Sequence, residues 1–181
     1  MTTLRSRIIS GLFIFQTAML ISCGTGNIYV SGSLKNSGDK KCAIAGFIFK
    51  DIKGEKDFPH ISGEFSDAIS IYFLQSGFSV IERGRIDIIL KELDLQQSGI
   101  TSEGDAVKVG RLASVRYVVF GTGRLERTGD SYFLKAATVK MIDVETGEVV
   151  IMASRSGAGE LPIEVANEIG RDIREYFYGM N

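Results

Sequence analysis

From residue 42 onward, hydrophobic residues form runs of strand length in some segments and stripes with the period of an α-helix in others. Near-continuous apolar runs at 42–49 and 116–123 predict strands that are covered on both faces. Apolar residues spaced by three or four positions predict four helices. These helices cover 62–76, with Ser62 as its N-cap, then 85–95, then 105–113, with Asp105 as its N-cap, and finally 162–178.

Shorter alternating segments complete the predicted sheet. Residues 78–82 form a second strand after the first helix, and the strand at 116–123 continues to Arg127. Turn residues at 128–131 and 145–147 separate two further strands, at 132–143 and 148–156. The predicted fold is therefore α/β, a mixed β-sheet with flanking helices in the order β-α-β-α-α-β-β-β-α.

The N-terminus has the pattern of an export signal. Arg5 and Arg7 precede a largely apolar stretch at 8–21, which is shorter than the roughly 20 residues of a membrane-spanning helix. The stretch ends in Leu-Ile-Ser-Cys, which resembles the lipobox of bacterial lipoproteins. Residues 1–22 are thus predicted to be a lipoprotein signal peptide that is cleaved, leaving a lipidated Cys23. A buried core cysteine after an ordinary signal, or an uncleaved N-terminal helix, is the alternative.

Composition limits what the exported part can do. Residues 23–41 are rich in Gly, Ser, Asn and Lys and predict a flexible tether, in which 28–30 could add a short strand. One domain, 42–181, follows. Acidic side chains outnumber basic ones after the signal, which argues against nucleic acid as a partner. With Cys23 acylated, Cys42 has no cysteine left to pair with.

The sequence lacks the residue patterns of the common catalytic sites. His60 is the only histidine, so a His-rich metal site is excluded, and its neighbours indicate a helix-entry residue. No nucleophile-elbow, Walker or Cys-x-x-Cys motif occurs. Gly121-Thr122-Gly123 follows a strand but opens no helix, so a strand bend is favoured over dinucleotide binding. We therefore predict a non-enzymatic protein with no catalytic residue, cofactor, metal or small-molecule substrate.

Several segments in register resemble the CsgG family of curli assembly and transport proteins. They are Gly77–Arg83 with its Val-Ile-Glu-Arg end, Ile86–Leu93, Gln96–Gly99, Ala106–Leu112, Tyr117–Gly121 and Val139–Val150 with its Asp-Val-Glu-Thr-Gly-Glu turn. The resemblance implies a lipoprotein attached to the outer membrane, with its domain in the periplasm, that works by assembly or docking. The implied partners are further copies of the chain or another envelope protein. Gly24 after the cysteine also favours the outer membrane, by resemblance to known sorting rules.

A channel-forming secretion subunit is the alternative function. A pore subunit donates membrane strands of about 9–11 residues with an apolar outer face. The arms of the predicted 124–135 hairpin instead carry charged residues, namely Arg124, Glu126, Arg127 and Lys135. A channel would therefore need the 51–60 and 96–104 loops to refold into membrane strands. Within the last helix, Tyr176 and Tyr178 point partly away from the apolar stripe, so they are candidate adhesive residues, and the alternative is that they cap the edge of the core.

Overall fold

The computed structural model describes residues 25–36, 38–81, 83–95, 100 and 102–179. The described elements, in chain order, are β1 (Thr25–Val30), a 3-10 helix (Gly32–Asn36), β2 (Lys41–Asp51), α1 (Pro59–Gln75), β3 (Ser79–Ile81), α2 (Arg83–Glu92), α3 (Glu103–Ala113), β4 (Tyr117–Thr128), β5 (Ser131–Asp143), β6 (Val149–Glu160) and α4 (Pro162–Tyr178).

The strands form one mixed sheet in the order β1-β6-β5-β4-β2-β3. Strand β2 runs parallel to both β3 and β4, while the pairs β4–β5, β5–β6 and β6–β1 are antiparallel. The predicted α/β class with a mixed sheet is confirmed. The three-strand meander and the final helix also lie where the sequence placed them, although β6 continues four residues beyond the predicted end at Ser156.

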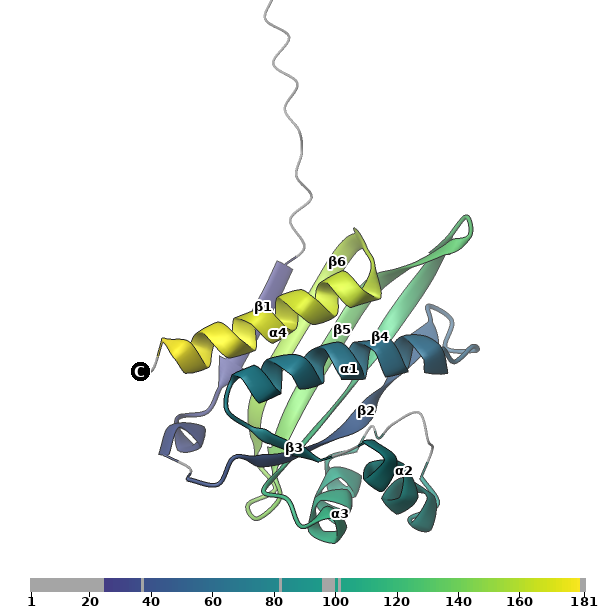
Figure 1. The fold of residues 1–181 in the computed structure, drawn as a ribbon. Coiled ribbons are helices and arrows are strands. Elements are labelled where there is room, and N and C mark those ends of the chain that lie inside the picture. The colour runs from purple at the N-terminus through teal and green to yellow at the C-terminus, as the bar shows by residue number, and fades with distance from the viewer. Residues whose placement is uncertain (1–24, 37, 82, 96–99, 101, 180–181) are drawn as a thin grey trace, which may run out of the picture.

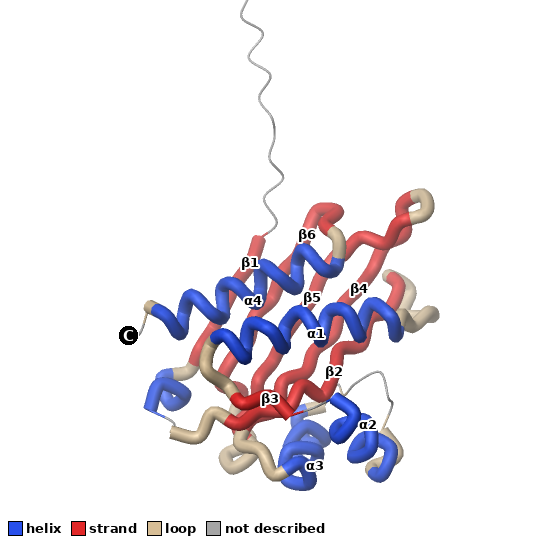
Figure 2. Tube along the Cα trace, viewed as in Figure 1, coloured by secondary structure: helices blue, strands red, loops and turns tan. Residues whose placement is uncertain are grey.

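Helices cover the two faces of the sheet unequally. Helices α1 and α4 lie side by side along one face, whereas α2 and α3 pack only near one end of the sheet (Figures 1 and 2). Alternate residues of a strand enter separate cores, as the two-residue period requires. Val119 of β4 belongs to the core under α1 and α4, and its neighbour Phe120 belongs to the core under α2 and α3.

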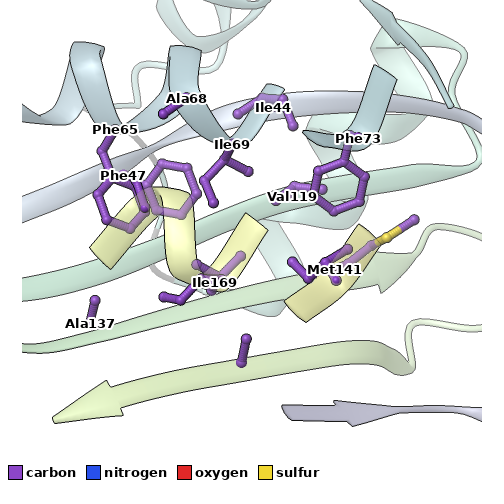
Figure 3. Packing of buried hydrophobic residues seen from close by; sticks show 14 of the residues in the cluster. Ile44, Phe47, Phe65, Ala68, Ile69, Phe73, Val119, Ala137, Met141 and Ile169 are labelled. Atoms are coloured by element: carbon purple, nitrogen blue, oxygen red, sulfur yellow. The ribbon is translucent and has the colours of Figure 1, made fainter. Parts of the chain in front are cut away.

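Aromatic rings fill the larger core, between the sheet and the α1–α4 pair (Figure 3). The Phe47 ring lies 4.8 Å from the Phe65 ring of α1, centroid to centroid. A Cβ atom on Gly121 would stand 2.8 Å from the Phe47 ring, closer than real side chains approach one another. The missing side chain of Gly121 therefore makes room for Phe47, a role that differs from the predicted strand bend.

The predicted starts of two helices are wrong. Helix α1 begins at Pro59, and Ser62 lies inside it, where its hydroxyl donates to the carbonyl oxygen of Phe58 at 3.1 Å. Helix α3 begins at Glu103 with Ser102 as the N-cap, three residues before the predicted cap Asp105. In both cases a residue suited to capping occupies an interior position close to the true start.

The prediction of a flexible tether over 23–41 is wrong at 25–36, where the structure has β1 and the 3-10 helix, and the short strand suggested at 28–30 lies within β1. Strand β1 pairs along its whole length with β6, from Thr25 opposite Ser156 to Val30 opposite Ile151. The 3-10 helix follows directly, and its Leu34 is buried in the larger core. Strand β1 thus begins two residues after Cys23 in the sequence.

Candidate functional site

One half of a sheet face is left without a helix, because α2 and α3 cover only the other half. We call this uncovered half the open sheet face. Three adjacent strands supply its residues, and a shallow pocket of about 230 Å³ lies between them. The pocket is lined by Ile48 and Lys50 of β2, Thr122, Gly123 and Arg124 of β4, and Ala136, Ala137 and Thr138 of β5.

Two cations border this pocket. The ammonium of Lys50 lies 3.6 Å from the carboxylate of Asp57, and an Arg124 guanidinium N–H donates to the main-chain carbonyl of Asp51 at 3.2 Å. Small side chains between them leave the surface shallow. Cationic and hydroxyl groups on a shallow surface suit the carboxylates and main-chain carbonyls of a docked protein segment.

A second polar cluster joins the start of β4 to the end of β5. The Arg116 guanidinium donates to one carboxylate oxygen of Asp143 at 2.6 and 3.0 Å, and it also pairs with Glu145. The hydrogen bond to Asp143 raises the pKa of Arg116 above its already high usual value. The other Asp143 oxygen accepts the main-chain N–H groups of Glu145 and Thr146 at 2.9 and 3.2 Å. One carboxylate oxygen of Asp143 therefore binds Arg116, and the other holds the β5–β6 turn.

This second cluster borders a polar pocket of about 430 Å³, lined by Ser33, Gly38, Asp39, Arg116, Tyr117, Asp143, Thr146 and Glu148. Sequence reasoning missed the Arg116–Asp143 pair, although the Asp-Val-Glu-Thr-Gly-Glu turn contains one partner. It also missed the open sheet face. The alternation of polar and small residues over 122–124 was the available signal for that face.

The sequence-predicted site residues do not come together. Cys23 and Glu82 lie outside the described residues. Cys42 is fully buried in β2, and burial raises the pKa of its thiol to about 12, so it stays protonated at neutral pH. His60 is exposed on the first turn of α1, beside the Phe58 ring. Within the described ranges no three His, Cys, Asp or Glu side chains gather as a metal site.

The two tyrosines of α4 differ from each other. Tyr178 is 60% exposed, and its hydroxyl donates to the carbonyl oxygen of Gln75, at the end of α1, over 3.4 Å. Tyr176 is half-buried, with its ring edge-on to Phe177 at 5.8 Å. Only Tyr178 therefore presents most of its ring to solvent.

Comparison with solved structures places this α/β fold among known proteins. It is similar to the PelC dodecamer from Paraburkholderia phytofirmans, with a TM-score of 0.52, 17% identity, and coverage of 84% of this chain and 96% of that chain. A second crystal form of that dodecamer, from a PelC variant, gives a TM-score of 0.55 and 16% identity over the same shares. The LpoB C-terminal domain from Salmonella enterica gives 0.49 and 11% identity, over 67% of this chain and 84% of that chain.

Residues 25–123 match the model of the family described as the curli production assembly/transport component CsgG. The matched segment is more than half of the chain, so the chain belongs to the CsgG family. No curated protein sequence matches it. Among the helices of the described residues, none is long and apolar enough to cross a membrane.

Proposed function

We propose that this chain is a lipid-anchored subunit of a cell-envelope assembly, held at the outer membrane by Cys23 and acting in the periplasm by docking proteins. One observation carries the proposal: a lipobox cysteine stands two residues before a CsgG-family domain. A domain that begins directly at its anchor is held close to the membrane. Its activity is then to present surfaces to partners at that membrane.

The open sheet face is the surface proposed for a protein partner. Lys50 and Arg124 offer positive charge, and Thr122 and Thr138 offer hydroxyl groups, over a pocket that is too shallow to enclose a small molecule. The partner is a further copy of the chain or another envelope protein. The similarity of the fold to a dodecamer supports association between copies.

A channel-forming secretion subunit is the second candidate, favoured by the transport role in the family's description and by the dodecameric neighbour. Detergent extraction followed by negative-stain imaging separates the two functions. Rings that enclose a lumen support the channel. Single domains, or partner complexes without a lumen, support the adaptor.

The anchor is tested by replacing the lipobox cysteine. Cys23→Ala should abolish cleavage after Ser22 and incorporation of labelled palmitate, because the thiol is the acyl acceptor. The matched control is Cys42→Ala, which removes the other cysteine and should leave both intact. Palmitate incorporation by Cys23→Ala would refute the assigned lipidation site.

Docking is tested by reversing charge on the open sheet face. Lys50→Glu combined with Arg124→Glu should reduce the recovery of crosslinked partners from intact envelopes. Lys91→Glu, on the exposed face of α2, is the control and should leave recovery unchanged. Equal recovery from the double variant and the control would place the docking surface elsewhere.

A further inference from the structure

One end of the sheet collects the segments nearest the proposed anchor. The start of β1 lies there together with the β4–β5 turn at 129–130, the β6–α4 junction at 160–163 and the loop at 52–58 (Figure 1). The β5–β6 turn and the end of α4 lie at the opposite end. We call the first group the anchor end of the domain.

Chain length sets how far this end can stand from a lipidated Cys23. Thr25 follows Cys23 by two residues, and a fully extended chain of two residue steps spans at most about 7 Å. The acyl chains would therefore enter the membrane close to the first residue of β1.

Measured from the level of Thr25 along the strand direction, the tip of the β4–β5 hairpin lies farther out than Cys23 can lie. Thr25 lies opposite Ser156, and Ser156 lies opposite Ala136 of β5. From Ala136 the strand runs on to Ser131 at the hairpin tip, a rise of about 15 Å. Cys23 can lie at most about 7 Å beyond Thr25 in this direction, so the hairpin tip extends about 8 Å farther than Cys23. That difference matches the depth of about 5–10 Å at which interfacial segments lie in a membrane.

The side chains at the anchor end suit a membrane surface. Leu161 and Ile163, at the β6–α4 junction, are each 39% exposed although they are aliphatic. Next to the hairpin tip Tyr132 is half-buried, with its hydroxyl 3.3 Å from the ammonium of Lys56. Exposed aliphatic residues beside tyrosine and lysine are the composition found where proteins meet the headgroup layer.

We propose that the anchor end of this domain sits in the phospholipid headgroup layer of the membrane that holds Cys23. The hairpin tip and the Leu161–Ile163 junction enter that layer, and the strands point toward the bilayer. This orientation rests on the proposed lipidation of Cys23. In this orientation the open sheet face stands roughly perpendicular to the membrane plane, where proteins in the periplasm can reach it.

The test places a fluorescent label at either end of the acylated mature protein. The protein is reconstituted at low density in vesicles of phosphatidylethanolamine and phosphatidylglycerol. Labelled cysteines are introduced by Asp130→Cys or Ile163→Cys at the anchor end, and by Ile88→Cys on exposed α2 as the matched control. Acylation blocks Cys23, and Cys42 is fully buried, so the introduced cysteine takes the label.

Lipids with a nitroxide on the headgroup should quench the labels at 130 and 163 several-fold more than the label at 88. Inserting about ten Gly and Ser residues after Gly24 should reduce this quenching while the protein still floats with the vesicles. Equal quenching at all three labels, or quenching that survives the spacer, overturns the proposed orientation. A blue-shifted label that lipid-borne quenchers do not reach indicates burial against protein and also overturns it. Protein that does not float has lost the anchor itself, which is a failure of the proposed lipidation.

Discussion

Single residues hold the ends of the sheet in place. Arg116 stands at the start of β4 and Asp143 at the end of β5, and their ion pair is mostly buried. One carboxylate oxygen of Asp143 accepts hydrogen bonds from Arg116, and the other accepts them from the main chain of the turn at 145–146. Removing the guanidinium would leave a buried carboxylate without its charged partner.

We expect Arg116→Met to lower the free energy of unfolding by about 1.5–3 kcal/mol, the range for a hydrogen bond to a charged group. Arg127→Met is the control, because Arg127 and its partner Asp130 are both exposed. Its effect should stay below about 1 kcal/mol. Chemical denaturation of the soluble domain measures both, and equal losses would show that the Arg116 pair contributes no more than a surface pair.

Ile44 of β2 tests whether the larger core carries the stability of the fold. Its side chain is buried in the core under α1 and α4, so Ile44→Asp should unfold the domain. An unpaired buried carboxylate costs several kcal/mol, against a total stability of about 5–15 kcal/mol. Ile88→Asp makes the same change at a side chain that is 61% exposed and should leave the circular dichroism of the domain intact.

At the scale of elements, helix α3 shows how a short polar motif sets a boundary. The Ser102 hydroxyl accepts the main-chain N–H of Asp105 at 3.0 Å and donates to its carboxylate at 2.7 Å. The hydrogen bond from the Ser102 hydroxyl, followed by the one from Lys108, holds the pKa of Asp105 below its usual value. Ionised Asp105 therefore stabilises the helix start.

Ser102→Ala should cost about 1 kcal/mol of unfolding free energy at neutral pH, as the loss of an N-cap does. The pKa of Asp105 should rise toward its ordinary value, which carboxyl NMR titration measures. Because the folded pKa is depressed, this stabilisation is present above the unfolded pKa and is lost as pH falls through the folded value. The variant should accordingly lose less stability on acidification than the parent does. An unchanged Asp105 titration would contradict this, and Ser131→Ala, on the exposed hairpin, is the control.

The sequence pattern predicted those elements whose own residues determine them. Predicting β2 and α4 needed no tertiary information, because the spacing of their apolar residues indicates whether one face or both faces are buried. Only the apolar half of strand β1, at 28–30, was suggested by the sequence, because residues 25–27 are Thr, Gly and Asn and the hydrogen bonds of the strand come from β6. The open sheet face was missed for a related reason. The alternation over 122–124 marks a strand segment with an exposed side, but which half of the sheet lacks a helix depends on how far α2 and α3 extend, and that segment does not determine this.

The whole molecule exposes an apolar patch far from the anchor end. Ile71 and Leu74 project from the last turns of α1 with more than half of each side chain exposed. The hydrogen bond from Tyr178 to Gln75 brings the end of α4 beside them. Of the two candidate adhesive residues, only Tyr178 therefore belongs to this patch, together with Ile71 and Leu74 of α1.

If copies of the chain associate through this patch, Leu74→Ser combined with Tyr178→Ser should lower the mass of the soluble domain in light scattering. The melting temperature should stay within about 4 °C of the parent, because exposed side chains contribute little to the core. Ile88→Ser combined with Leu112→Ser removes exposed aliphatic side chains from α2 and α3 and should leave the mass unchanged. A large fall in melting temperature would show that Leu74 and Tyr178 close the edge of the core. An unchanged mass with normal melting would place the contact between copies on another surface, with the open sheet face the next to test.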